Sequence, residues 1–155
     1  MNFRLATSDD LELLVEMRLE FINVQVENDK YEDLRKNCYK HLFDKAFKAN
    51  ACEVVLAEDG DKCIGTGIVY YYDLIPSLYS PNGKKGYVTS MYVAPDYRRR
   101  GIGAEILEQL IERAKKRGVK EMFLNPSEMG RPLYEKRGFK DNHRDGMTLD
   151  LKNEK

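Results

Sequence analysis

The sequence predicts a single mixed α/β domain over residues 1–155, in which helices pack on a β-sheet. A chain of 155 residues has the length of one typical domain. Of these residues 42% are apolar, which is enough to form a core in a chain of this length. Segments with strand-like alternation and segments with helical periodicity follow one another in the order β-α-α-β-β-β-α-β-α-β, without an internal repeat, low-complexity segment or interdomain linker.

The first fifty residues predict one strand and two helices. Residues 2–6 form the strand, and a helix begins after Thr7, which can cap it beside acidic residues that suit the positive end of a helix. A second helix fits residues 31–48, and we interpret the acidic segment VENDKYED before it as a solvated loop. The apolar side of the first helix comprises Leu11, Leu14, Val15, Leu19 and Ile22, and that of the second comprises Leu34, Cys38, Leu42, Phe43, Ala46 and Phe47.

The middle of the chain predicts three strands. Residues 52–58 and 63–72 form a hairpin around the turn EDGDK. Residues 86–93 are rich in β-branched and aromatic side chains and form a third strand, which Pro95 ends. The long loop before it is expected to have a function and to expose Leu74, Ile75 and Leu78.

The last third of the chain predicts two helices and two strands. Residues 101–117 have the clearest helical periodicity, and Gly118 ends that helix. Residues 119–124 form a strand, and a turn and a helix follow. Residues 147–151 close the chain as an edge or hairpin strand after the turn HRDG, and a further strand near Lys140 is left open.

Composition and charge exclude several classes of function. The chain has 26 Lys and Arg and 26 Asp and Glu, whereas a general nucleic-acid-binding domain is normally strongly basic. Cys38, Cys52 and Cys63 match no zinc-binding spacing, so we expect no metal and a reduced, cytoplasmic protein. Neither a signal peptide nor a membrane-spanning stretch is expected. We interpret the basic run RAKKRGVK as cations that complement the C-terminal end of a helix.

The segment VAPDYRRRGIGAEIL has the layout of a phosphate site, because a strand leads through an arginine-rich glycine turn into a helix. The first turn of a helix has free N–H groups and a partial positive charge. Glycines let a bulky anion approach the backbone, and arginines add charge-assisted hydrogen bonds to phosphate oxygens. A solvated arginine cluster at a helix start is the alternative interpretation. The turn lacks the Gly-Lys-Ser/Thr of a P-loop and the third glycine of the dinucleotide fingerprint, since Ile106 stands there.

The remaining pattern, Arg98-x-x-Gly101-x-Gly103, resembles the pyrophosphate loop of the GNAT superfamily of acetyl-CoA-dependent N-acetyltransferases. The preceding MYVAP looks like the family's Leu-x-Val-x-Pro strand end. The later LYEKRGF, at 133–139, is similar to its Leu-Tyr-x-x-x-Gly-Phe signature. Together with the Ser-Asp-Asp start of the first helix, these matches extend over residues 1–151.

The resemblance implies a fold and a binding mode for acetyl-CoA as co-substrate. The fold is a mixed, mostly antiparallel central sheet with helices on both faces, splayed between the strands at 86–93 and 119–124. Acetyl-CoA would lie in that gap, with its pantetheine arm along Met91, Tyr92 and Val93 like a partial extra strand. The pyrophosphate would rest on Arg98, Arg99, Arg100, Gly101, Ile102, Gly103 and Ala104, with Arg98 and Arg99 the stronger phosphate ligands and Arg100 equally able to face solvent.

The resemblance also implies a catalytic role for Tyr134. In the family, a tyrosine at this place lies near the acetyl sulfur and protonates the leaving thiolate. A phenol suits this role, because it keeps its proton at pH 7 yet can give it to a more basic thiolate. The residues alone would favour a core tyrosine beside Leu133 and Phe139.

Positions shortly before this tyrosine depart from the family pattern. Relatives often have Asn and Ala where this chain has Ser127 and Gly130. Asn125, together with Ser127, is interpreted either as a CoA contact or as the start of a helix with Asn as its cap. In the second case Pro132 would kink the helix; otherwise the helix begins near Gly130.

The predicted function is transfer of the acetyl group of acetyl-CoA to a primary amine in a ternary complex. The alternative is a catalytically silent CoA-binding module that regulates or binds a partner. The acceptor is expected to be a small molecule, with a weak preference for a cationic amine; a peptide amine, longer acyl chains and a homodimer stay open. The strand at 86–93 has no carboxylate to act as general base, so deprotonation would use ordered water or an acid among Glu20, Glu27, Asp29, Glu32 and Asp33.

Overall fold

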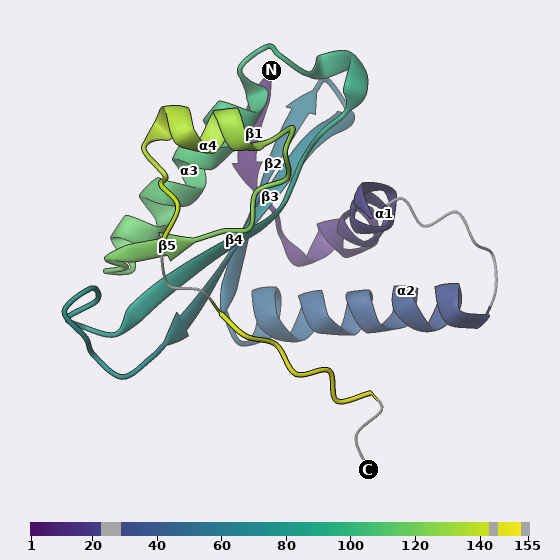
Figure 1. Ribbon diagram of the computed structural model, residues 1–155. Coiled ribbons are helices and arrows are strands. Elements are labelled where there is room, and N and C mark those ends of the chain that lie inside the picture. The colour runs from purple at the N-terminus through teal and green to yellow at the C-terminus, as the bar shows by residue number, and fades with distance from the viewer. Residues whose placement is uncertain (23–28, 143–145, 153–155) are drawn as a thin grey trace. The chain divides into compact units, whose positions relative to one another are not determined.

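The computed structural model describes residues 1–22, 29–142 and 146–152, in two compact units, Met1–Asn125 and Pro126–Lys155 (Figure 1). The described part of the second unit contains one helix, α4. Among the described residues no helix is long and apolar enough to cross a membrane. The elements are β1 (Asn2–Leu5), α1 (Leu11–Phe21), α2 (Asp29–Leu42), β2 (Cys52–Asp59), β3 (Lys62–Asp73), β4 (Lys84–Val93), α3 (Ile102–Lys116), β5 (Glu121–Phe123) and α4 (Arg131–Arg137), with short 3₁₀ turns at Ser8–Asp10 and Pro95–Tyr97.

The five strands form one sheet in the order β1-β2-β3-β4-β5. The first three pairings are antiparallel, and β5 is parallel to β4. The β2–β3 hairpin closes through Gly60, whose φ of 60° is the left-handed conformation that a tight turn requires. The predicted mixed, mostly antiparallel sheet is therefore confirmed.

Helices cover both faces of this sheet, α1 and α2 on one face and α3 on the other (Figure 1). Val54, Leu56 and Ile68 point toward α1 and α2 and share a buried cluster with Leu14 of α1. On the opposite face, a Cβ atom at Gly67 would lie 2.6 Å from Ile106 of α3. Glycine at this position lets α3 pack directly against the backbone of β3.

A partly buried ion pair joins α3 to β2. The Glu53 carboxylate accepts hydrogen bonds from Arg113 of α3 and, at 2.6 Å, from the Tyr71 hydroxyl. Burial raises the pKa of Glu53, but the hydrogen bonds from Arg113 and Tyr71 outweigh it, so the pKa lies below its ordinary value. The carboxylate thus stabilises the folded state in its ionised form.

Replacing Glu53 by Gln is expected to lower the free energy of unfolding at pH 7 by roughly 1–3 kcal/mol, because a buried charge-assisted interaction is lost. Since the folded-state pKa is depressed, the contribution is present above the unfolded pKa and disappears as the pH falls through the folded one. The difference in free energy of unfolding between wild type and Glu53→Gln, measured by urea unfolding, should therefore decrease from pH 7 to pH 3. Exposed Glu32→Gln is the control. A difference that stays constant over this pH range would contradict the stabilising role of the ionised Glu53 carboxylate.

Two expectations for the helices need correction. Residues 29–33 lie in α2 and not in a loop, while residues 26–28 of the predicted link lie outside the described residues. Phe43 is 44% exposed and not part of the apolar side, because the winding becomes π-helical at Phe43–Lys48 and the Ala49 N–H bonds to Asp44, five residues back. Of the two alternatives for the segment before Tyr134, a helix that starts near Gly130 is confirmed: α4 begins at Arg131, with Pro132 in its first turn, where its missing N–H is tolerated, and Asn125 caps no described helix.

The predicted final strand is also wrong. Residues 147–151 are not in a strand, and Met147, Leu149 and Leu151 are 101%, 70% and 68% exposed. Alternating apolar residues fit a strand, but a strand forms only where a neighbour pairs with its backbone. Residues 139–142 contain no strand either, and most of the predicted turn HRDG lies outside the described residues.

Candidate active site

The centre of β4 contains a β-bulge. Thr66 pairs with Tyr92 and Ile68 with Thr89, so the single residue Gly67 of β3 stands opposite both Ser90 and Met91. Ser90 has a φ of 52°, an uncommon conformation for a residue with a side chain. Bulges occur beside active sites, where they redirect side chains and interrupt pairing.

Among the described residues, β5 pairs with Lys85, Gly86 and Tyr87 of β4, and no strand pairs with this edge of β4 from Val88 onward, where the sheet splays. The Ala94 N–H donates to Ile64 of β3 over 2.8 Å, and neighbouring residues of a strand direct their backbone groups to opposite sides. The backbone groups of Val93 and Met91 therefore face the open edge, where an extended ligand can bind like a strand.

The turn after β4 leads into the N-terminus of α3 and brings several backbone N–H groups together there. Arg99 and Gly101 have φ values of 62° and 82°, and Gly101 is the cap residue of α3. The first hydrogen bond of the helix runs from the Glu105 N–H to the Gly101 carbonyl. Among the described residues, nothing accepts a hydrogen bond from the N–H groups of residues 99–104. Such a nest of N–H groups at a helix N-terminus suits a phosphate.

The three arginines of this turn have different surroundings. Arg98 donates from Nε to the Val93 carbonyl over 2.9 Å, so it bridges the turn to the strand edge. The Arg100 guanidinium lies 5.3 Å from the centre of the Tyr97 ring. Within the described part of the chain, the Arg99 side chain has no hydrogen bond or ion pair, and it is exposed.

In the second unit, Tyr134 lies on α4 and is buried, 9% exposed. Its ring meets Phe139 edge to face, with the ring centres 6.0 Å apart. Burial raises the pKa of Tyr134 above its ordinary value, so the phenol keeps its proton at neutral pH. Both the core role and the catalytic role anticipated for this residue need a protonated, well-packed phenol.

Ser127 holds the turn before α4. Its Oγ accepts a hydrogen bond from the Gly130 N–H at 3.0 Å, and its carbonyl accepts one from the Arg131 N–H at 2.9 Å. A Cβ at Gly130 would lie 3.3 Å from the Tyr134 ring, so the absence of a side chain there leaves room for the tyrosine. Asn125, at the end of the first unit, is exposed.

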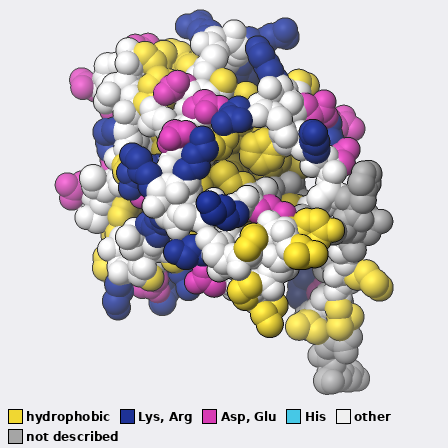
Figure 2. Space-filling model, turned by 90° about the vertical axis from the view of Figure 1, so that its left-hand side faces the viewer, with side chains coloured by type: hydrophobic (Ala, Val, Ile, Leu, Met, Phe, Trp, Pro, Cys, Tyr) yellow, Lys and Arg dark blue, Asp and Glu magenta, His cyan; other side chains and the backbone are white. Residues whose placement is uncertain are grey.

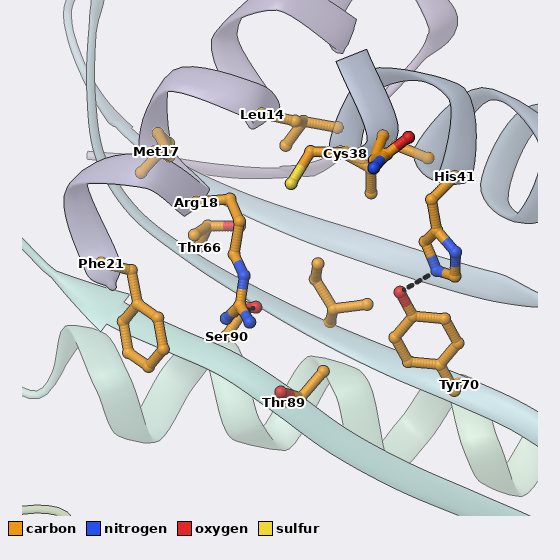
Figure 3. A pocket seen from close by; sticks show the side chains of 13 residues that line it. Leu14, Met17, Arg18, Phe21, Cys38, His41, Thr66, Tyr70, Thr89 and Ser90 are labelled. Atoms are coloured by element: carbon orange, nitrogen blue, oxygen red, sulfur yellow. Dashed lines mark hydrogen bonds between the residues drawn. The ribbon is translucent and has the colours of Figure 1, made fainter. Parts of the chain in front are cut away.

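A cavity of about 360 Å³ lies between α1 and α2 and the sheet, entirely within the first unit (Figure 3). Figure 3 shows Arg18 and Ser90 together at one end and His41 and Tyr70 at the other. Arg18 donates to Ser90 Oγ over 3.1 Å, and His41 Nε2 lies 2.6 Å from the Tyr70 hydroxyl. Burial raises the pKa of Tyr70 to about 12.

Of the carboxylates that the sequence suggested as general bases, the described Glu20, Glu32 and Asp33 do not line this cavity. Glu20, at the end of α1, accepts a hydrogen bond from the Tyr92 hydroxyl at 2.6 Å. Burial and, to a lesser extent, this hydrogen bond raise the pKa of Tyr92 to about 12. Glu32 and Asp33 are exposed on α2, and Glu27 and the Asp29 side chain lie outside the described residues. Among the described residues, no group of His, Cys, Asp and Glu is placed to hold a metal ion.

Residues 18–139 match the model of the acetyltransferase (GNAT) family. The chain belongs to this family. It is 31% identical to a predicted acetyltransferase from Clostridium acetobutylicum, whose crystal structure contains acetyl-CoA; the match covers 97% of this chain and 96% of the other, with a TM-score of 0.85. A GCN5-related N-acetyltransferase from Ralstonia eutropha JMP134 shares the fold, with 23% identity, coverage of 96% and 97%, and a TM-score of 0.81.

A curated relative of this GNAT chain is glucosamine 6-phosphate N-acetyltransferase of Trypanosoma brucei brucei. The two are 36% identical over 66 residues, which are 43% of this chain and 44% of the relative. The match therefore spans less than half the length of that relative. The substrate of this GNAT chain has to be inferred from its own residues.

Sequence reasoning missed the cavity of this GNAT chain, although one signal was visible. Arg18 lies four residues after Leu14 and four before Ile22, so a positive charge interrupts the apolar side of a predicted helix. Thr66 and Tyr70 belong to a predicted strand and carry no comparable signal. Their position in the cavity depends on the pairing of β3 with β4.

The loop before β4 is exposed, as predicted. Leu74, Ile75 and Leu78 are 55%, 90% and 98% exposed. Figure 2 views the side on which this loop projects in Figure 1 and shows hydrophobic side chains at the surface among Lys and Arg. The loop is fixed at its base, where Ser80 is fully buried and its hydroxyl donates to the Lys84 carbonyl over 3.2 Å.

Proposed function

We propose that this protein is an N-acetyltransferase that moves the acetyl group of acetyl-CoA to a primary amine in a ternary complex. The observation that carries the proposal is the continuity of two features: the unpaired edge of β4 leads directly into the N–H nest at residues 99–104. A ligand with an extended arm followed by a pyrophosphate would meet the strand edge and the N–H nest in this same order. The 31% identical Clostridium protein, solved with acetyl-CoA, supports the same co-substrate.

The co-substrate contacts follow from this order. The pantetheine arm pairs with the backbone of Met91 and Val93 beside Tyr92, and the pyrophosphate binds the N–H groups from Arg99 to Ala104. Arg99 supplies the side-chain charge, while Arg98 shapes the strand end through the Val93 carbonyl. Further contacts come from Asn125 and from the Ser127 hydroxyl, whose proton stays available because its oxygen accepts the Gly130 N–H.

The chemistry is a direct displacement. The neutral amine nitrogen attacks the thioester carbon, an N–H at the bulge near Met91 stabilises the developing oxyanion, and the carbon–sulfur bond then breaks. The CoA thiolate takes the phenolic proton of Tyr134, the nitrogen loses its extra proton to water or a base, and the Tyr134 phenolate regains a proton from water. The products are an acetamide and CoA thiol. The raised pKa keeps Tyr134 protonated until the thiolate forms.

The acceptor in this proposal is a small molecule that binds in the cavity between α1, α2 and the sheet. Its volume of about 360 Å³ is in the range of small-ligand sites. The cavity reaches the bulge through Thr89 and Ser90, next to the strand edge assigned to the thioester. The three cysteines are free, which fits the reducing cytoplasm as the place of action.

Release of CoA thiol from acetyl-CoA, measured with a panel of primary amines, tests this function. The panel includes amino acids, amino sugars and their phosphates, polyamines and peptides with a free N-terminus. We expect amine-dependent thiol release and a product heavier than the amine by one acetyl group. Tight acetyl-CoA binding without turnover of any amine would instead support a silent CoA-binding module.

A further inference from the structure

We propose that the acceptor amine carries an anionic oxygen group, a carboxylate or a phosphate, and that Arg18 binds this group in the cavity. The inference rests on the proposed acetyl transfer and adds the chemical class of its acceptor. It depends on three observations: the surroundings of Arg18, a buried hydroxyl without a partner, and the charges that line the cavity.

Arg18 is half-buried and directs its guanidinium into the cavity (Figure 3). A guanidinium has five N–H donors, and the hydrogen bond described for this side chain uses one of them, to Ser90 Oγ. Among the described residues, no carboxylate lies within ion-pair distance of it, and the guanidinium carbon lies 5.5 Å from the centre of the Phe21 ring. A half-buried cation that no described carboxylate neutralises is suited to an anionic ligand.

Thr66 supplies an independent observation at the same end of the cavity. Its side chain is 96% buried, since its exposed fraction is 4%, and within the described part of the chain nothing hydrogen-bonds to its Oγ1. A buried hydroxyl normally has a partner, so an unmatched one at a cavity wall indicates a ligand that provides it. Thr66 lies four residues from Tyr70 along β3, roughly 13 Å, which separates it from the His41–Tyr70 pair.

The cavity wall contains a cation and no acid among the residues that the structure describes. A polyamine or other cationic acceptor would need a carboxylate there, so the lining favours an anionic acceptor over the cationic amine that the sequence weakly favoured. Arg18 also lies next to Ser90, at the bulge where the thioester is placed. The anionic group should therefore be close to the amine in the covalent structure of the acceptor.

Matched pairs of amines test the inference. Tyrosine and tyramine differ by a carboxylate, and glucosamine 6-phosphate and glucosamine differ by a phosphate. Wild type is expected to have a kcat/KM at least tenfold higher for the anionic member of one pair, and that pair identifies the anion. Arg18→Gln should lower the ratio of kcat/KM for the anionic member to kcat/KM for the neutral member by about 10- to 100-fold, because the charge-assisted bonds to the anionic group are lost.

Three variants make the result specific. Arg18→Lys should recover part of the preference, since it restores the charge but not the planar fork of donors. Thr66→Val removes only a hydroxyl and should weaken binding of the anionic member without loss of fold. Arg35→Gln is the matched control, because Arg35 pairs with Glu12 and Glu16 outside the cavity. Acetyl-CoA affinity and melting temperature are measured for each variant.

Binding without turnover separates this inference from the proposed function. The Arg18 Nε–H signal in ¹H–¹⁵N spectra, assigned by its loss in Arg18→Gln, should shift when the anionic amine is added. Such a shift in a protein that acetylates no amine would uphold the inference and overturn the transfer activity. Equal kcat/KM for both members of each pair, unaffected by Arg18→Gln, would uphold the activity and overturn the inference. An unchanged Arg18 signal with all four amines would also overturn it.

Discussion

Replacing Tyr134 by Phe is expected to reduce kcat by about 10²- to 10⁴-fold, the usual range for loss of a general acid. The variant lacks the proton that the CoA thiolate requires, but its ring can keep the edge-to-face contact with Phe139. The dissociation constant of acetyl-CoA should therefore change by less than about twofold, because binding does not depend on the phenolic proton. Steady-state kinetics and isothermal titration with acetyl-CoA measure the two effects.

The pH profile adds a second readout for Tyr134. Its pKa is raised by burial, so the catalytically competent protonated form persists up to the ordinary tyrosine range and is lost only as the pH rises through the shifted value. Wild-type activity should fall in strongly alkaline solution, and Tyr134→Phe should lack this limb. Tyr72→Phe, an exposed tyrosine on β3, is the control. A Tyr134→Phe enzyme with wild-type kcat at all pH values would assign Tyr134 to the core alone.

Replacing Arg99 by Gln should weaken binding of CoA by about 10- to 100-fold, because one charge-assisted contact to phosphate is lost. Arg99 is the arginine of the turn whose side chain has no partner among the described residues. Pantetheine lacks the pyrophosphate, so its affinity should not change. Competition against acetyl-CoA turnover measures both ligands.

The comparison among the arginines makes this prediction specific. Lys116→Gln removes one positive charge at the opposite end of α3 and should leave CoA binding within about twofold. Arg98→Gln should instead weaken pantetheine and CoA alike, since it releases the Val93 carbonyl at the strand edge. An equal loss for both ligands in Arg99→Gln would place Arg99 with the strand edge and not with the phosphate.

Local signals in the sequence predicted most of the fold. The β2–β3 hairpin, β4 and α3 were predictable because turn residues and apolar periodicity act over a few neighbouring positions. The closing strand at 147–151 was not, because pairing depends on a partner elsewhere in the chain. The outward position of Phe43 followed from a change in helical winding that a uniform 3.6-residue period does not reveal.

The sequence by itself determined the family and predicted a phosphate site at the turn before α3, because the glycines and arginines of that turn lie within seven consecutive residues. It also singled out Tyr134 through its family motif. Only the tertiary structure decided how the arginines differ and which polar groups share a cavity: Arg18 and Ser90 are 72 residues apart in sequence but hydrogen-bonded. Dihedral preferences and periodicity are local, whereas a cavity and its charge arise when distant segments pack against one sheet.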